Sequence, residues 1–296
     1  MDSPYPRGLM NLWRWMLIAG LLSAGFALAQ PVQEQAITYL SGSLKIKARV
    51  FFPAGDGPFP AVLFNHGGVD GLTEGTLDRC RELAVAGYVV FASSYRGEDG
   101  SDGTVEIAKG EVDDVLAGLE WLRKEPKVDP NRIAAVGTSH GALVSLLAAS
   151  RTDRLKALVF AYGIADIYTW FDYLKATNQL GKDELTRRTY GNGPKDRPES
   201  FRIRHGLAVL EKLPKTIPVL ILQGLKDTTV PPAQAQALAL GLKSQGQPYT
   251  LKLYPNSAHG FIISRKTLQK QGEKSAAYLE SLQAWAALLG FLKANL

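Results

Sequence analysis

The chain of 296 residues is long enough for one large α/β domain or two small ones, and its hydrophobic content of 46% excludes a disordered protein. Its formal net charge of +6 comes from scattered Lys and Arg residues rather than from a dense basic run interleaved with aromatic residues, so we expect no nucleic-acid partner. The single cysteine, Cys80, excludes an internal disulfide, and its helical surroundings indicate a structural thiol. The four histidines lack the short spacing of metal ligands, so we expect neither a metal nor another cofactor.

The first 29 residues have the layout of a secretory signal peptide. Arg7 and Arg14 precede an apolar stretch at residues 15–22, and Ala27-Leu28-Ala29 supplies small residues at the two positions that signal peptidases require. We expect cleavage after Ala29 and export to the periplasm or the extracellular space, with no stable membrane span afterwards. The alternative is an uncleaved segment that anchors the protein in a membrane, although the apolar stretch is short for a span.

After this segment, short apolar runs alternate with helical patterns. The predicted strands are residues 36–40, 44–52, 61–65, 88–94, 132–136, 157–162, 219–223 and 250–254, and the predicted helices are residues 77–86, 111–124, 141–150, 232–244 and 273–293. Continuous apolar strands separated by helices predict a mostly parallel, eight-stranded sheet flanked by helices. No helix separates the first two strands, so they should form an antiparallel edge.

Residues 165–216 interrupt this alternation, because they contain no clear strand but many aromatic residues. We expect a helical insertion after the sixth strand, placed over the edge of the sheet where open α/β folds bind their ligands. Aromatic side chains such as Trp170 and Phe171 should then build an apolar pocket for the substrate, and arginines such as Arg188 and Arg204 should place charge at its rim. An ordinary packed excursion with no role in substrate selection is the alternative.

Ser139 lies in a Gly-x-Ser-x-Gly motif, residues 137–141, between the predicted strand 132–136 and a run of small apolar residues. A sharp turn between a strand and a helix exposes the serine hydroxyl in a strained conformation, and the flanking glycines let the two elements pass closely. The helix N-terminus also favours negative charge that develops beside the serine. This context indicates that Ser139 is a nucleophile rather than part of a plain glycine-rich turn.

A serine nucleophile needs a general base, and three histidines follow Ser139 in the sequence. His140 is its direct neighbour, and its side chain should point away from the hydroxyl. His205 lies inside the insertion. His259 follows the last predicted strand, at the level of the serine turn, and we therefore predict that His259 is the base.

The base needs an acid that orients it, and two aspartates follow neighbouring strands. Asp166 comes after the strand 157–162, and Asp227 comes after the strand 219–223. We favour Asp227 because a short turn fixes its position and the next loop of this kind carries His259. Its carboxylate would hold the imidazole in the required tautomer and stabilise the imidazolium without taking the proton.

The oxyanion of a tetrahedral intermediate needs backbone N–H donors. The residue after the nucleophile, His140, supplies one of them. The turn after the third predicted strand reads His66-Gly67-Gly68-Val69, which is the type found in lipases and esterases, and we expect its Gly68 to supply the second donor. Gly67 and Val69 are the alternatives for that donor. The ring of His66 should brace the turn rather than take part in the reaction.

These motifs together resemble the α/β-hydrolase superfamily, and in particular the catalytic domain of the prolyl oligopeptidase family and dienelactone-hydrolase-like proteins. The matching segments are His66-Gly67-Gly68, Tyr95-Arg96-Gly97, His259-Gly260-Phe261 and residues 111–114, 128–133, 137–141, 218–224 and 227–231. The resemblance implies that residues 30–296, including the insertion, form one α/β-hydrolase domain. In that family the serine, aspartate and histidine of these motifs form a catalytic triad, which supports Ser139, Asp227 and His259.

The sequence also departs from the family pattern. Only a short segment precedes the first predicted strand, where the peptidases carry a large β-propeller; the His-Gly-Gly turn lacks the proline that often follows; and Ala142 stands where the peptidases usually have a glycine. We therefore expect a serine hydrolase that cleaves an ester or a short peptide through an acyl-enzyme, with a carboxylesterase or a dienelactone-hydrolase-like esterase as the alternative.

The same positions bear on two further classes of protein. Haloalkane dehalogenases and epoxide hydrolases are excluded, because they need an aspartate in place of Ser139. A non-catalytic binding protein on this fold is the remote alternative, and it would be expected to lack a member of the triad, whereas this sequence has all three. The sequence leaves the acyl group, the leaving group and the oligomeric state open.

Overall fold

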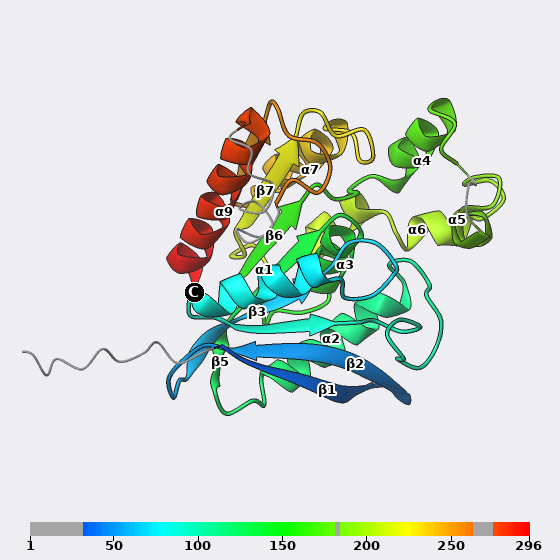
Figure 1. The fold of residues 1–296 in the computed structure, drawn as a ribbon. Coiled ribbons are helices and arrows are strands. Elements are labelled where there is room, and N and C mark those ends of the chain that lie inside the picture. The colour runs from blue at the N-terminus through cyan, green and yellow to red at the C-terminus, as the bar shows by residue number, and fades with distance from the viewer. Residues whose placement is uncertain (1–31, 181–183, 263–274) are drawn as a thin grey trace, which may run out of the picture. The chain divides into compact units, whose positions relative to one another are not determined.

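The structure is a computed structural model that describes residues 32–180, 184–262 and 275–296 (Figure 1). Residues Val32–Leu296 belong to one folded unit. The predicted signal segment, residues 1–29, lies outside the described residues. Within the described part of the chain, no helix combines the length and the apolar composition needed to cross a membrane.

An eight-stranded sheet forms the core of this unit (Figure 1). In chain order the strands are β1 (Gln33–Ser41), β2 (Leu44–Phe52), β3 (Phe59–Asn65), β4 (Val89–Ser93), β5 (Val128–Thr138), β6 (Ala157–Ala161), β7 (Val219–Gly224) and β8 (Tyr249–Tyr254). Their order across the sheet is β1-β2-β4-β3-β5-β6-β7-β8. β2 pairs antiparallel with both β1 and β4, whereas the other neighbours are parallel. The prediction of a mostly parallel sheet with an antiparallel edge is confirmed.

Helices cover both faces of the sheet (Figure 1). The helices are α1 (Glu74–Val85) and α9 (Ala276–Asn295) on one face, and α2 (Gly110–Leu122), α3 (His140–Ala149) and α7 (Ala233–Ser244) on the other. The strands alternate accordingly: Val62 and Phe64 of β3 pack with α1 and α9, and Ala61 and Leu63 pack with α2 and α3. Because β3 to β8 run parallel, their carboxyl ends meet at one edge, where the loops that carry the candidate residues begin.

A helical segment lies between β6 and β7, and it consists of α4 (Ile167–Ala176), α5 (Glu184–Tyr190), α6 (Pro198–Arg202) and the 3₁₀ helix η1 (Gly206–Lys212). In Figure 1, α4, α5 and α6 extend beyond the carboxyl ends of the strands. Phe171, Tyr190 and Phe201 hold this segment together, with ring centroids 5.1 to 6.4 Å apart and no ring more than 3% exposed. Phe171, which we expected to line a substrate pocket, is therefore part of the segment's own core.

The fifth strand is longer than its apolar run predicts. It begins at Val128 rather than at residue 132, because Val128 pairs with Phe59 of β3 before the regular register resumes at Ile133 opposite Ala61. The intervening residues 129–132 are polar and include Pro130, and they bulge out of the ladder with little burial. Their composition hides the start of the strand from a search for apolar runs.

Candidate active site

Ser139 lies between the last residue of β5 and the first residue of α3, as the motif predicts. Its backbone has φ 53° and ψ −121°, a conformation that side-chain-bearing residues rarely adopt. The N–H of Ser139 donates to the carbonyl oxygen of Ala161 at the end of β6, at 2.9 Å. The sheet therefore fixes the strained turn, and the hydroxyl is presented at the sheet edge.

The two flanking glycines are required by close packing. A Cβ at Gly137 would lie 2.3 Å from the carbonyl oxygen of Gly141, and a Cβ at Gly141 would lie 2.2 Å from the carbonyl oxygen of Asn65. Both distances are far shorter than van der Waals contact, and the atoms met are backbone atoms that cannot move aside. The spacing of the motif thus follows from how closely α3 passes β5 and the end of β3.

His259 lies between Ser139 and Asp227 and contacts both. Its Nε2 is 2.9 Å from Ser139 Oγ, and its Nδ1 is 2.7 Å from Asp227 Oδ2. A carboxylate can only accept, so Nδ1 carries the hydrogen, and Nε2 of the neutral ring is left to accept the serine proton. Tyr162, which follows β6, meets the imidazole edge to face, with ring centroids 5.1 Å apart.

The Asp227 carboxylate is buried and has donors on both oxygens. Oδ1 accepts from the N–H groups of Thr229 and Val230 at 2.9 and 2.8 Å, and Oδ2 accepts from Gln223 Nε2 at 3.3 Å in addition to His259. Gln223 also donates to the carbonyl oxygen of Val230. Sequence reasoning missed Gln223, although its signal is visible: it is the one polar residue of the otherwise apolar run in β7.

The loop that carries His259 is anchored to α9. Glu280 accepts hydrogen bonds from the backbone N–H of Asn256, at 3.0 Å to each oxygen, and from Ser257 Oγ at 2.6 Å. The carbonyl oxygen of Ser257 in turn accepts from the N–H of Lys226, beside Asp227. The loops of the acid and the base are thus tied to each other and to a helix, which limits how far His259 can move from Ser139.

The turn after β3 approaches Ser139 at Gly67, where an added Cβ would lie 2.9 Å from Ser139 Cβ. Two histidine rings fix the peptide planes that follow. His66 Nδ1 is 3.1 Å from the carbonyl oxygen of Gly67, and His140 Nδ1 is 3.0 Å from the carbonyl oxygen of Gly68. Since a trans peptide holds its N–H opposite its C=O, these contacts orient the N–H groups of Gly68 and Val69.

His66 is itself fixed by contacts with Glu98 and Tyr95. Its Nε2 lies 3.1 Å from Glu98 Oε2, with both side chains at most 2% exposed, and its ring stacks on Tyr95 at a centroid distance of 4.3 Å. The contact between His66 Nε2 and Glu98 Oε2 is attractive only if one of the two atoms carries a hydrogen that the other accepts. Glu98 follows the Tyr-Arg-Gly motif, and sequence reasoning gave it no role. The buried stack supports the expectation that His66 braces the turn.

The remaining candidates for base and acid pair with each other. His205 Nδ1 lies 3.4 Å from Asp166 Oδ1, and Asp166 Oδ1 accepts from the N–H of Tyr168 at 3.0 Å at the start of α4. His140, the third histidine, directs its Nδ1 to Gly68. The structure therefore brings Asp227, His259 and Ser139 together, and it gives Asp166 and His205 contacts within the helical segment.

The burial of Cys80 agrees with the sequence-based prediction, whereas the burial of Arg204 does not. Cys80 is buried, as predicted for a structural thiol, and burial raises the pKa of its thiol to about 12. Arg204, expected at the rim of a pocket, is only 4% exposed. Its guanidinium is drawn inward because it donates to the carbonyl oxygens of Glu106 and Ile107, about a hundred residues earlier in the chain. Among the described residues, no cluster of His, Cys, Asp and Glu is suited to a metal ion.

His140 gives the site a pH dependence in its stability. Burial is the main cause that lowers the pKa of His140 to about 4; the neighbouring His66 and the charge of Arg204 add to it and outweigh the hydrogen bond to Gly68. In the unfolded chain the pKa is about 6.5. The contribution of His140 to the free energy of unfolding is therefore complete above about pH 6.5 and is lost as the pH falls toward 4. The reason is that the unfolded chain binds a proton at this residue in that pH range, whereas the folded chain does not.

We expect this ionisation to remove about 2 kcal/mol of unfolding free energy between pH 7.5 and pH 5. The variant His140→Asn keeps an N–H near the position of Nδ1 for the carbonyl oxygen of Gly68 but cannot titrate. Urea unfolding at several pH values should therefore give a shallower decline for the variant than for the wild type. Equal slopes would show that His140 does not carry this dependence.

A mostly parallel sheet of this order, with a glycine-flanked serine turn after β5 and with Asp227 and His259 in the loops after β7 and β8, has the architecture of the α/β-hydrolase fold. Comparisons with known proteins agree. The uncharacterized peptidase YtmA of Bacillus subtilis (strain 168) is 27% identical over 234 residues, which make up 79% of this chain and 88% of that protein. The profile of the prolyl oligopeptidase family matches residues 79–284, more than two thirds of the chain.

Solved structures share the fold. The acylaminoacyl peptidase of Pyrococcus horikoshii superposes with a TM-score of 0.73 and 21% identity, over 92% of this chain and 43% of that one. The hyperthermophilic esterase of Pyrobaculum calidifontis superposes with a TM-score of 0.65 and 22% identity, over 88% of this chain and 85% of that one. This chain thus spans less than half of the archaeal peptidase. It belongs to the prolyl oligopeptidase family and is a serine hydrolase.

Proposed function

We propose that Ser139, His259 and Asp227 form the catalytic triad of this hydrolase. The observation that carries the proposal is the continuous contact from Ser139 Oγ through His259 to Asp227, at 2.9 and 2.7 Å. Ser139 Oγ attacks the substrate carbonyl carbon while His259 Nε2 accepts its proton. His259 then gives this proton to the leaving alcohol or amine, and the acyl group stays on the serine as an ester.

Water completes the cycle. His259 removes a proton from a water molecule, the resulting hydroxide attacks the acyl-enzyme, and the serine leaves with the proton held by His259. The negative oxygen formed in each half of the reaction would be stabilised by the backbone N–H groups of His140 and Gly68. This assignment is supported by the orientation of the Gly68 peptide, whose carbonyl side is held by His66.

The substrate is proposed to be an ester or a short peptide. The family includes peptidases, and the structural relatives include an acylaminoacyl peptidase and an esterase. Both bonds are cleaved by the same acyl transfer, so the geometry of the triad supports either. Aromatic side chains on α4 reach the loop after β7: Trp170 Nε1 and the Tyr173 hydroxyl donate to the carbonyl oxygens of Thr229 and Thr228.

The proposal is tested by comparing substrates on one preparation. A p-nitrophenyl butyrate ester and a dipeptidyl p-nitroanilide should be assayed side by side, and a fluorophosphonate should label Ser139 in the same sample, as found by peptide mass spectrometry. We expect hydrolysis of the ester and labelling at Ser139. Labelling at a different serine, or hydrolysis without any labelling, would overturn the assignment of the nucleophile.

We also propose that the protein is exported. The support is the order of basic, apolar and small-residue regions in the first 29 residues. N-terminal sequencing of the protein from its native host should begin at Gln30 or its cyclised form. An intact Met1 or Met10 terminus in a soluble cytoplasmic fraction would contradict export, and an intact terminus in the membrane fraction would support the anchored alternative.

A further inference from the structure

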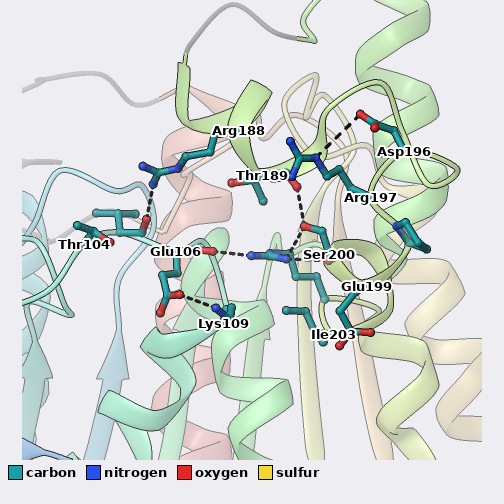
Figure 2. Close-up of a pocket in the computed structure, with 13 residues that line it drawn as sticks. Thr104, Glu106, Lys109, Arg188, Thr189, Asp196, Arg197, Glu199, Ser200 and Ile203 are labelled. Carbon is teal, nitrogen blue, oxygen red and sulfur yellow. Dashed lines mark hydrogen bonds and ion pairs between the residues drawn. The ribbon is translucent and has the colours of Figure 1, made fainter. Parts of the chain in front are cut away.

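A cavity of about 570 Å³ is lined by none of the residues Ser139, His259 and Asp227. Figure 2 shows that the loop before α2, with Thr104, Glu106 and Lys109, forms one wall, and the end of α5 with α6 forms the other. Arg188 and Arg197 stand on the second wall and Glu106 on the first (Figure 2). The cavity therefore opens between the main body of the fold and the helical segment.

The residues that line this cavity carry more positive than negative charge. Four basic and three acidic residues line it. Two of the acidic side chains already pair with cations. The two oxygens of Glu106 contact Lys109 and Arg96, and Arg202 binds both oxygens of Glu199. The third, Asp196, accepts from the N–H of Asn192 at 3.0 Å. The carboxylates of the cavity are thus engaged, and an excess of one positive charge remains.

The basic side chains of the cavity are less well matched. Arg188 Nη2 donates to the carbonyl oxygen of Val105 at 2.8 Å, and Arg204 donates to peptide carbonyls and to Ser200 Oγ. Among the described residues, neither guanidinium forms a salt bridge with a carboxylate. Arg197 Nε lies 4.0 Å from Asp196, the limit of an ion pair. Guanidinium groups hold five donors each, so unused N–H groups remain.

Arg204 makes this imbalance costly. It is 4% exposed, it lines the cavity, and its nearest partners are neutral oxygens. Burial lowers the pKa of Arg204, an effect that Tyr190, Glu111 and Glu106 partly oppose. A charge that is held away from water with only neutral oxygens as direct partners is unfavourable, and an anion in the adjoining cavity would offset that cost. The buried guanidinium and the two exposed ones thus point to the same kind of ligand.

We propose that this cavity binds a small monocarboxylate with a short aliphatic chain. Arg188 and Arg197 would take the carboxylate, since planar guanidinium groups match its two oxygens, and Val105, Pro198 and Ile203 would contact the aliphatic part. The excess of a single positive charge favours a monoanion over a dianion such as phosphate. The carboxylate can belong to a free acid or to the acidic end of a substrate whose reacting bond lies at Ser139.

Calorimetry on the full-length protein tests the proposal, with hexanoate as the probe, hexanamide as its neutral counterpart and inorganic phosphate as the dianion. The variants are Arg188→Gln and Arg197→Gln, singly and together; both side chains are exposed, so folding should be retained. We expect hexanoate binding to weaken about tenfold or more in the double variant. Arg154→Gln, which removes an exposed arginine that pairs with Asp153, is the matched control and should bind like the wild type.

The outcomes are distinct. Unchanged hexanoate affinity in the double variant, equal binding of hexanamide, or tighter binding of phosphate would overturn the proposal. A loss of affinity confined to the cavity variants would support it. Hydrolysis of p-nitrophenyl butyrate in the presence of hexanoate then separates the sources: a raised KM that the double variant abolishes indicates the acidic end of a substrate, and an unchanged KM indicates a free acid. Because binding is measured directly, the result does not depend on the catalytic assignment.

Discussion

The variant Ser139→Ala should lose esterase activity by on the order of 10⁴-fold or more in kcat on p-nitrophenyl butyrate. In the proposed mechanism the substitution removes the atom that bonds to the acyl group, and His259 Nε2 is left without the hydroxyl that lies 2.9 Å away. Steady-state kinetics with active-site titration of the wild type gives the ratio. Activity that remains should come from the backbone donors alone, acting on attack by water.

The folded state should tolerate this change, because alanine keeps the Cβ and the strained backbone of Ser139. Ser139→Gly removes the Cβ and relieves a strain of about 1–3 kcal/mol, partly offset by about 0.5–1 kcal/mol of added backbone entropy in the unfolded chain. Denaturant unfolding should thus rank the glycine variant as at least as stable as the wild type, although both variants are inactive. That combination distinguishes loss of the nucleophile from loss of the fold.

A matched control is Ser244→Ala, at the exposed end of α7, where the hydroxyl donates to the carbonyl oxygen of Gly241. Its kcat should equal that of the wild type. The assignment would fail if Ser139→Ala retained more than a small fraction of activity after purification away from host esterases, since no other serine of the described residues forms a hydrogen bond with His259.

The sequence carries the position of Ser139 and His259 because both depend on local order along the chain. Gly137 is required by contacts with residues four to eight positions later in the chain, and Gly141 by contacts with the end of β3, so the motif can be recognised in the sequence. His259 and Asp227 each follow a parallel strand, and parallel strands end at the same edge. A pattern of strands is therefore enough to bring these residues to one place.

The supporting contacts were not predictable in the same way. Glu98 meets His66 only because the loop after β4 folds back over the turn after β3, and nothing in the spacing of the two residues indicates this. Arg204 reads as a surface arginine, yet its partners at Glu106 and Ile107 lie 98 and 97 residues away. Phe171 reads as a pocket residue, yet it packs on Phe201. Such contacts depend on the tertiary path of loops, which periodicity does not encode.

The second large effect concerns the acid, and Asp227→Asn should lower kcat by on the order of 10³- to 10⁴-fold. The N–H groups of Thr229 and Val230 point at Oδ1, so the amide oxygen of the asparagine must take that position. Its NH₂ group then faces His259 Nδ1, and it donates where the carboxylate accepted. The imidazole is forced to carry its hydrogen on Nε2, and it can no longer accept the proton of Ser139.

Asp166→Asn is the matched comparison, because it makes the same replacement of a carboxylate by an amide at the alternative candidate for the acid. Asparagine caps a helix about as well as aspartate, so α4 should keep its first turn, and His205 is the histidine that loses a neighbouring carboxylate. We expect kcat within about threefold of the wild type, since neither residue contacts His259 or Ser139. The reverse ranking would place the acid after β6. An equal, large loss in both variants, with normal unfolding curves, would mean that the helical segment takes part in positioning the base. The contacts of Asp227 alone would then not explain how His259 is oriented.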